Sequence, residues 1–566
     1  MIQMIEINAK FVHNNLALRY FREIASNYHL PVLHQSFTIN QSANLILSAI
    51  REMDSQVYLF SCYIWNIDLV LKLSKAIKML DSAAKIILGG PEVSFHDEDW
   101  LKKHDYIDVI LKNEGETWFT KIGQLYESDP KMLLAYLSLL KGIVAEPALM
   151  DISGLGVPYT DSELETFKIA YYESSRGCPY TCSYCMSARG SKLRYKSIEQ
   201  VKLDLARFFR ANTPVIKFVD RTFNAPVDRA IAIMDYIKEI DNGVTTCHFE
   251  LSPTLLNDKL ISKIATLRKN LVQFEIGIQS TNERTIKAIQ RNMPISSLAM
   301  VEKLCALDNC HTHLDLIAGL PYEGVEEFEK SFNDVLALGP DHLQLGMLKI
   351  LHGSLIKEQL KEHGYVYDEH PPYEFYQNRY LSFLQKQDLV ACEEGVESYH
   401  NAELFTNTLA HLYKSIDSPY RFYQQIGAVL IHNQLHSFPD GFDNRLILLR
   451  DMIVEHTSST VEMVEGLLAF DLLNVNQKLP KSLSHMRVET HGKWHDVIRN
   501  HPEMIPTSLK EQSAKQLIKL MTVFKSNYHI FEKRMTDDEL YYVKFKNDEA
   551  IRLLDTANVK ELKEFY

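Results

Sequence analysis

The chain of 566 residues lacks several features that would place it in a large class of proteins. No uninterrupted apolar stretch approaches the roughly 20 residues of a membrane span, and no basic region followed by an apolar run begins the chain as a signal peptide would. A basic excess is also missing: the net charge of −12 argues against a broad nucleic-acid surface. Eight cysteines are too few for a disulfide scaffold, so we expect a reducing, cytoplasmic location.

The clearest chemical signal is a short loop with the sequence GCPYTCSYC, which holds Cys178, Cys182 and Cys185. Three thiolates can hold three irons of a 4Fe–4S cluster, which leaves the fourth iron open to a substrate or a second cofactor. A structural zinc ion normally takes four protein ligands, and a disulfide uses cysteines in pairs. Neither suits three cysteines on one loop, although a zinc site completed by a ligand from elsewhere in the fold stays an alternative.

The first 125 residues alternate short apolar segments with helical periodicity, which predicts an α/β fold with a doubly wound parallel sheet. Such sheets bind ligands outside the carboxyl ends of their strands. The turn Gly89-Gly90-Pro91 and the segment Asn113-Glu114-Gly115-Glu116 both follow predicted strands, so we expect both at that edge. The predicted strands are 1–7, 32–37, 57–62, 85–88 and 107–111, and helices are predicted at 15–26 and 67–80.

Residues 166–350 repeat the alternation and predict a partial parallel (βα)6 barrel. Active groups in βα barrels lie at the carboxyl ends of the strands, and the cysteine loop follows the first strand directly. The predicted strands are 168–174, 215–220, 245–250, 272–277, 311–317 and 342–348. We therefore expect a sheet domain at 1–130, a linker at 131–165, a barrel at 166–385 and a mainly helical domain at 386–566.

The last of these domains carries no motif that indicates a chemistry. Amphipathic patterns predict helices at 445–456, 459–472 and 513–524, and residues 537–545 predict a short strand. The isolated residues Cys62, Cys247 and Cys392 are interpreted as core.

The cysteine loop, with Tyr184 before its last cysteine, resembles the cluster-binding loop of radical S-adenosylmethionine (radical SAM) enzymes. Segments at the ends of later strands, VDRTFN, EIGIQS and LDLIAGLPYEG, also resemble that family and follow in its order. The resemblance implies that SAM binds the open iron and contacts residues along these segments, although the family's usual Gly-Gly-Glu form is missing after the second strand. The implied SAM-binding residues are Tyr184, Asp220, Arg221, Asn224, Glu250, Gln279, Ser280 and Gly319.

Other interpretations of these residues stay open. Glu250 could be a buried carboxylate that pairs with a barrel lysine or arginine, and Arg221 could be a solvated charge. Gln279 and Ser280 could form a turn and a helix cap. Arg291 is interpreted as a surface charge on a helix, with a contact to a carboxylate of SAM or of the substrate as the alternative.

The front segment resembles the cobalamin-binding domain that precedes many radical SAM enzymes, on the strength of ILGGPEVS and NEGE. The residues implied to bind cobalamin are Gly89, Gly90, Pro91, Glu114 and Gly115. The D-x-H-x-x-G motif, whose histidine ligates cobalt in the methionine synthase type of domain, is absent. The segment after the barrel resembles, in its layout, a bacterial domain of unknown function that accompanies such proteins.

The resemblance implies an enzyme that cleaves SAM with an electron from the cluster and functionalises an unactivated C–H bond. Cobalamin would then allow methyl transfer, although the same layout serves ring closure and rearrangement. The implied partners are a small-molecule or peptide substrate and a reductant such as flavodoxin or ferredoxin. The lack of an apolar span and the acidic charge balance argue against a membrane and against nucleic acid as partners. Two alternatives remain: a cobalamin-independent catalyst whose front domain docks a partner, and an iron–sulfur redox sensor without turnover.

Overall fold

The protein is described by a computed structural model that covers residues 1–53, 55–145, 149–188, 192–435, 441–490, 494–546, 548 and 550–555. The chain forms two compact units. The first unit comprises residues 1–340 and 345–386, and the second comprises residues 341–344 and 387–566. Among the described residues, no helix has both the length and the apolar character that a membrane crossing requires.

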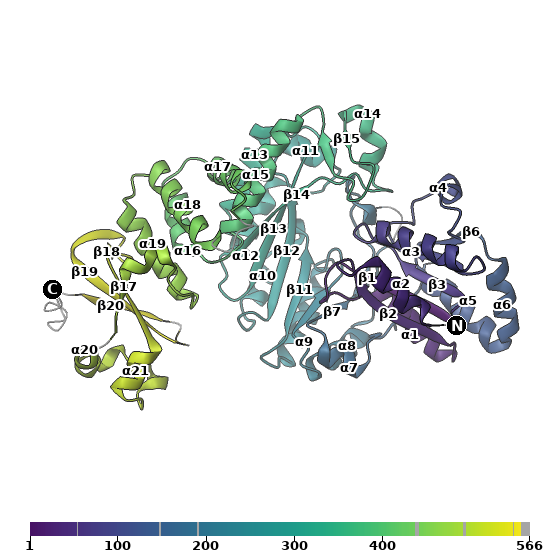
Figure 1. The fold of residues 1–566 in the computed structure, drawn as a ribbon, viewed down its shortest axis with the longest axis horizontal. Coiled ribbons are helices and arrows are strands. Elements are labelled where there is room, and N and C mark those ends of the chain that lie inside the picture. The colour runs from purple at the N-terminus through teal and green to yellow at the C-terminus, as the bar shows by residue number, and fades with distance from the viewer. Residues whose placement is uncertain are drawn as a thin grey trace. The chain divides into compact units, whose positions relative to one another are not determined.

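The first unit begins with a six-stranded parallel sheet in the order β2-β1-β3-β4-β5-β6, as the alternating pattern predicts (Figure 1). The strands are β1 (Ile2–Asn8), β2 (Val32–Thr38), β3 (Val57–Ser61), β4 (Lys85–Gly89), β5 (Val109–Lys112) and β6 (Gly142–Ala145). The helices of this part are α1 (Leu16–Asn27), α2 (Ala43–Arg51), α3 (Ile67–Leu80), α4 (Glu98–Lys103), α5 (Glu116–Ser128), α6 (Pro130–Leu139) and α7 (Asp161–Thr166). The sequence pattern missed β6, which lies within the segment interpreted as a linker.

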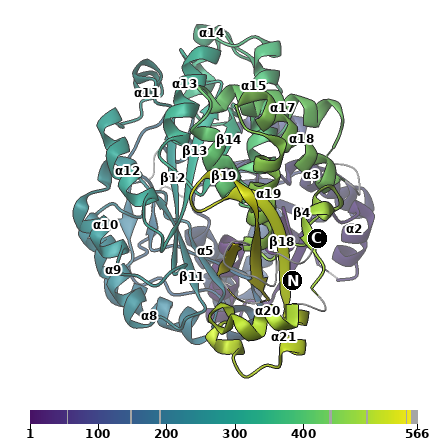
Figure 2. The ribbon, with the colours of Figure 1, turned by 90° about the vertical axis from the view of Figure 1, so that its left-hand side faces the viewer.

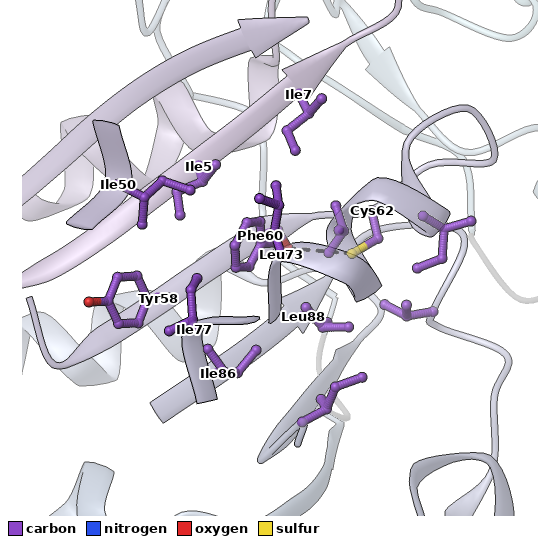
Figure 3. Close-up of a cluster of buried hydrophobic side chains, with 14 of the residues drawn as sticks. Ile5, Ile7, Ile50, Tyr58, Phe60, Cys62, Leu73, Ile77, Ile86 and Leu88 are labelled. Atoms are coloured by element: carbon purple, nitrogen blue, oxygen red, sulfur yellow. Dashed lines mark hydrogen bonds between the residues drawn. The ribbon is translucent and has the colours of Figure 1, made fainter. Parts of the chain in front are cut away.

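Helices cover both faces of this sheet, because successive strand residues point to opposite sides. On one face Ile5, Phe60 and Leu88 pack with residues of α2 and α3, as Figure 3 shows for Leu73 and Ile77. On the other face the alternate residues of the same strands pack with α1, α5 and α6. Cys62 is fully buried in the first of these cores, which agrees with its interpretation as a core residue.

The second sheet of this unit has six strands in the order β14-β13-β12-β11-β10-β7, and every pair whose register is described is parallel. Figure 2 shows helices α8, α9, α10 and α12 along the outside of these strands, as a partial βα barrel requires. The strands are β7 (Ile169–Tyr172), β10 (Val215–Phe218), β11 (Thr246–Leu251), β12 (Val272–Gln279), β13 (His311–Ala318) and β14 (His342–Met347). The helices are α8 (Ile198–Arg210), α9 (Val227–Glu239), α10 (Asp258–Ile264), α11 (Glu283–Ala288), α12 (Leu298–Cys305), α13 (Val325–Leu336) and α14 (Leu360–His363).

Two small antiparallel pairs complete the first unit. The pair β8 (Ser175–Arg176) and β9 (Arg194–Tyr195) joins the two ends of the cysteine loop, with Arg176 opposite Arg194. The pair β15 (Val366–Tyr367) and β16 (Phe375–Gln377) follows the barrel. The cysteine loop is therefore closed at its base by the chain itself.

The second unit is helical in its first part, as expected, and then forms a four-stranded antiparallel sheet that the sequence pattern largely missed. The predicted helix at 513–524 ends at Leu520, and the chain continues as β18. The predicted strand at 537–545 lies within β19. The helices are α15 (Phe383–Tyr399), α16 (Thr406–Tyr413), α17 (Pro419–His432), α18 (Gly441–His456), α19 (Val461–Asn474), α20 (Trp494–Asn500) and α21 (Ala514–Leu520). The strands are β17 (Arg487–Val488), β18 (Met521–His529), β19 (Arg534–Phe545) and β20 (Ile551–Asp555).

Candidate functional site

The cysteine loop lies at the carboxyl end of β7, where the barrel topology places it. Cys182 is buried, and Cys178 and Cys185 are partly exposed. The backbone holds the loop in place at Ser183: its N–H donates to the Ile289 carbonyl at 2.9 Å, and its carbonyl accepts from Ile356 N–H at 2.9 Å. The loop is thus fastened on both sides while two of its thiols remain accessible.

The spacing of the thiols bears on which metal group they fit. None of the three loop cysteines forms a disulfide, so the disulfide alternative does not apply. Among the described residues, the three cysteines do not form a group whose ligand atoms all lie within 4.8 Å of one another. Three thiolates can hold three corners of a 4Fe–4S cluster, whereas a structural zinc ion would need a fourth protein ligand.

Arg291 lies against the loop, and its interpretation as a surface charge is wrong. Its guanidinium donates to the Tyr184 hydroxyl at 2.9 Å, to the Cys182 sulfur at 3.7 Å and to the Gly277 carbonyl. Burial raises the pKa of the Cys182 thiol, and the positive charge of Arg291 opposes that rise. Helical periodicity missed this contact because Arg291 lies beyond the end of α11, where the chain turns back toward β12.

The base of the loop carries a network of ion pairs that the sequence analysis did not foresee. Arg176 contacts Glu173 at 2.6 Å, Glu116 at 2.9 Å and Glu114 at 3.3 Å. Arg194, on the paired strand β9, forms two contacts with Glu114. Burial alone would raise the pKa of Glu114, but Arg194 and Arg176 lower it overall. The carboxylate of Glu114, predicted to bind cobalamin, is therefore already paired with arginines at the base of the cysteine loop.

The turn Gly89-Gly90-Pro91 lies at the carboxyl edge of β4, as predicted. Gly90 has φ +111°, and a Cβ there would lie 2.5 Å from the Cys62 carbonyl oxygen. A Cβ on Gly115 would lie 2.5 Å from the Phe21 ring. Both glycines are thus required by the protein's own close packing, whatever ligand the edge binds.

The same edge presents an aromatic surface that the motifs did not include. Trp65 follows β3, is 45% exposed, and stacks on Tyr63 with ring centroids 4.4 Å apart. An exposed tryptophan at the ligand-binding edge of a parallel sheet suits a large flat ligand such as a corrin. An aromatic residue soon after a predicted strand was the sequence signal that could have identified it.

Two of the predicted SAM-binding side chains are used inside the protein. Asp220 is buried and accepts hydrogen bonds from the Ser174 N–H at 2.8 Å and from the Ser174 and Ser175 hydroxyls at 2.6 Å. Asn224 exchanges hydrogen bonds of 2.9 Å with the Ser252 backbone, which ties the β10 end to the β11 end. These side chains position the strand ends, and a SAM contact by either one stays a prediction.

Arg221 and Glu250 lie at the same strand ends and are more open. Their charged groups are 3.6 Å apart, and the Arg221 side chain is 56% exposed. Burial raises the pKa of Glu250, and Glu275 adds to that rise while Arg221 opposes it. The interpretation of Glu250 as a carboxylate paired with a barrel arginine agrees with this geometry, and it leaves the predicted SAM contact untested.

Gln279, Ser280 and Gly319 mark the ends of β12 and β13. Gln279 has φ 72°, and its side-chain oxygen is buried without a hydrogen-bond partner in the described part of the chain. Ser280 donates to Glu323 at 2.5 Å and accepts from the Asn282 N–H at 3.0 Å, so it closes the turn into α11. Gly319 has φ +93°, and its carbonyl accepts from the Tyr365 hydroxyl at 2.7 Å. The orphaned Gln279 oxygen is the group here that a polar ligand such as SAM would satisfy.

The inner face of the barrel sheet carries further charged side chains that the motif search did not single out. Glu275 lies 3.4 Å from Lys217 and 3.5 Å from His248, and Asp315 lies 3.1 Å from His313. Burial, with Glu275 and Glu250 nearby, raises the pKa of Asp315 to about 8. Polar residues at alternate positions of β12 and β13 were the signal, because one face of each strand points into the barrel.

Three family models match separate stretches of the chain: the B12 binding domain at residues 2–122, the radical SAM superfamily at 172–335, and a protein of unknown function (DUF4080) at 361–545. These matches confirm the predicted order of a cobalamin-binding-type domain, a radical SAM barrel and a domain of unknown function.

Two curated relatives are similar to part of this chain. The cobalamin-dependent radical SAM methyltransferase TokK of Streptomyces tokunonensis is 27% identical over 57% of this chain and 52% of its own length. The 2-(S-pantetheinyl)-carbapenam-3-carboxylate methyltransferase of Streptantibioticus cattleyicolor is 26% identical over 53% of this chain and 48% of its own. The chain thus spans about half the length of these relatives.

The solved structures support the fold. The cobalamin-dependent SAM radical enzyme OxsB, with aqua-cobalamin and SAM bound, matches with a TM-score of 0.53 and 14% identity over 91% of this chain and 83% of its own. The radical SAM methyltransferase TsrM of Kitasatospora setae, with cobalamin and a 4Fe–4S cluster bound, matches with a TM-score of 0.52 and 13% identity over 65% of this chain and 78% of its own.

Proposed function

We propose that this chain, which carries a B12 binding domain, a radical SAM domain and a DUF4080 region, is a radical SAM enzyme that also uses cobalamin. Cys178, Cys182 and Cys185 would hold a 4Fe–4S cluster, and SAM would bind beside it. The observation that carries the proposal is a loop of three thiols at the carboxyl end of a barrel strand, held by Arg291 through Cys182 and Tyr184. When bound, the cluster supplies the electron that cleaves SAM, so that a hydrogen can be removed from an unactivated carbon.

The protein's own residues would orient these groups and keep water away. Arg291 fixes Tyr184 and Cys182 relative to the end of β12, and the ion pairs of Arg176 fix the base of the loop. Gln279 offers an unpaired amide oxygen to a ligand at the same strand ends. The other residues proposed to surround SAM are Tyr184, Asp220, Arg221, Asn224, Glu250, Ser280 and Gly319.

Cobalamin would bind at the carboxyl edge of the first sheet. The residues proposed to bind cobalamin at that edge are Gly89, Gly90, Pro91, Glu114 and Gly115. The exposed Trp65 adds an aromatic surface. Both curated relatives are named as methyltransferases, so methyl transfer to a small-molecule or peptide substrate is the proposed reaction, with ring closure as the second candidate. The electron would come from a reductant such as flavodoxin or ferredoxin. The division into 1–130, 131–165, 166–385 and 386–566 remains part of the proposal.

The decisive experiment is anaerobic cluster reconstitution of the full chain and of its Cys182→Ala variant. We expect the wild type to show 4Fe–4S absorbance and to release 5′-deoxyadenosine from SAM under dithionite, and we expect Cys182→Ala to lose both. Cys305→Ala, a partly exposed cysteine outside the loop, is the matched control and should retain both. SAM cleavage that persists in Cys182→Ala would refute the proposal, and a cluster without any SAM cleavage would indicate a redox sensor.

Retention of cobalamin is tested separately. The chain is incubated with hydroxocobalamin, desalted and examined for corrin absorbance. Retained corrin in the wild type supports the cobalamin-dependent reaction, whereas SAM cleavage without retained corrin would favour the alternative in which the front domain docks a partner.

A further inference from the structure

Three side chains of metal-ligating type meet outside the cysteine loop: Glu92, His96 and His352. One ligand atom from each lies within 4.8 Å of the ligand atoms of the other two. Glu92 and His96 follow β4, whereas His352 follows β14, so these donors are far apart in sequence and are brought together by folding within the first unit. We propose that they bind a divalent transition-metal ion of the zinc class.

His96 provides the independent observation that points to a ligand. The residue is only 7% exposed, its ring stacks on Trp100 at 4.2 Å, and it meets the His352 ring edge-on at 4.6 Å. Within the described part of the chain, neither ring nitrogen of His96 has a hydrogen-bond partner. The His96 ring thus lies beside the other two donors without a competing hydrogen bond from the described part of the chain, as a metal ligand requires.

The surroundings hold the other two donors in position. The Tyr373 hydroxyl donates to one carboxylate oxygen of Glu92, which orients the group and leaves the second oxygen to bind an ion. Such outer hydrogen bonds to ligands are typical of metal sites. Gly353 has φ +82°, and a Cβ there would lie 2.4 Å from the Phe95 ring, so the peptide after His352 packs directly on the residue before His96.

The donor set selects the class of ion. Two imidazole nitrogens and one carboxylate oxygen suit zinc, and three protein ligands leave a fourth position for water. Calcium and magnesium prefer oxygen donors and do not match two imidazoles. The ion would connect the loop after β4 to the segment after β14, and it would thereby hold the neighbouring turn Gly89-Gly90-Pro91 in place.

Lys357 is the group that competes with the ion. Its ammonium lies 2.7 Å from Nδ1 of His352, where it supplies a positive charge to the triad. Metal binding requires His352 to direct a lone pair to the ion, and Lys357 must then withdraw. Removing the Lys357 charge should therefore strengthen metal binding, which a structural role for the triad alone would not predict.

The test uses the full chain, Zn²⁺ binding measured by competition with a chromophoric chelator, and Co²⁺ as a spectroscopic probe. We expect one zinc ion that His96→Ala and His352→Ala each weaken about tenfold or more, and that Lys357→Met binds more tightly. His104→Ala, which removes a histidine that also stacks on Trp100, is the matched control and should bind as the wild type does. The Co²⁺ spectrum of the site should lack the thiolate charge-transfer band that the cysteine loop would give.

Unchanged zinc affinity in both His96→Ala and His352→Ala would overturn the proposal, as would a Co²⁺ spectrum with thiolate bands only. If circular dichroism shows that either alanine variant fails to fold, the Lys357→Met variant provides the test instead. Unchanged or weaker zinc binding in Lys357→Met would contradict the proposed competition between the Lys357 ammonium and the zinc ion for His352. The proposal does not depend on the proposed function, since it concerns a protein without cluster, SAM or cobalamin. Cluster content measured on the same samples keeps the two outcomes separate.

Discussion

Glu323 is a buried acid whose titration should be visible in the stability of the protein. It is fully buried and accepts hydrogen bonds from the Ser280 hydroxyl at 2.5 Å and the Ser331 hydroxyl at 3.0 Å. Its second oxygen has no hydrogen-bond partner within the described residues. Burial raises its pKa from 4.5 to about 7, although the two hydroxyls act in the opposite direction.

The sign of the pH effect on stability follows from the protonation of Glu323 in the folded and unfolded states. Between pH 4.5 and about 7 the folded protein holds a proton on Glu323 that the unfolded chain releases, so rising pH favours unfolding. A pKa raised from 4.5 to about 7 corresponds to about 3 kcal/mol of lost stability above pH 7, at about 1.36 kcal/mol for each unit of pH. Below pH 4.5 both states are protonated and the effect vanishes.

The perturbation is Glu323→Gln, which keeps the shape and the acceptor for both serines but cannot ionise. We expect the difference in free energy of unfolding, variant minus wild type, to increase by about 2 kcal/mol from pH 5.5 to pH 8. Urea denaturation followed by circular dichroism at several pH values measures this difference. The exposed Glu326→Gln, in the first turn of helix α13 just after Glu323, is the control and should show no such trend. A difference that stays constant with pH would refute the argument.

Three further changes test the site geometry. Gly90→Ala should destabilise the first sheet by about 1–3 kcal/mol, measured by urea unfolding, because φ is +111° and the new Cβ would lie 2.5 Å from the Cys62 carbonyl oxygen. Asp220→Ala should cost about 1–3 kcal/mol and lower cluster content after reconstitution, because it leaves buried serine donors unpaired; full cluster content would contradict this. Arg291→Lys keeps the positive charge but loses the planar guanidinium that contacts Cys182 and Tyr184 together. Cluster content should therefore persist, while the rate of SAM cleavage should fall about tenfold or more. An unchanged rate would show that positioning by Arg291 is unimportant.

The sequence predicted the parts of the fold that rest on strong local patterns. Strands such as β1, with seven buried residues, and helix α3, predicted with its observed bounds, stand out because burial and periodicity agree. Strand β6 was missed because its four residues, three half-buried and one exposed, lie at a sheet edge and carry little pattern. Helix α21 was predicted too long because the apolar residues of β18 continue its pattern. Whether such a segment forms a strand depends on pairing with strands that are distant in sequence, and the local sequence pattern does not show that pairing.

The candidate site divides in the same way. The cysteine loop and the strand-end segments were predicted because short spacing carries their chemistry. Other contacts depend on side-chain directions in the folded chain. These are the contacts of Arg291 with Tyr184, of Glu114 with Arg194, and of His96 with His352. Sequence spacing alone does not determine them.

The ion pairs at the base of the cysteine loop explain how a segment with little regular structure can hold thiols in fixed positions. Arg176 and Arg194 face each other across β8 and β9, and both contact Glu114, which follows strand β5 of the first sheet. Partly buried ion pairs contribute little net stability, because desolvation offsets their attraction, but losing one partner leaves a charge uncompensated. Their effect is therefore on geometry: a displacement of the loop base would separate Arg194 from Glu114 and Arg176 from the carboxylates around it. This couples the position of Cys178 and its neighbours to the segment 113–116, so the edge proposed to bind cobalamin and the loop proposed to bind the cluster are held by one set of contacts.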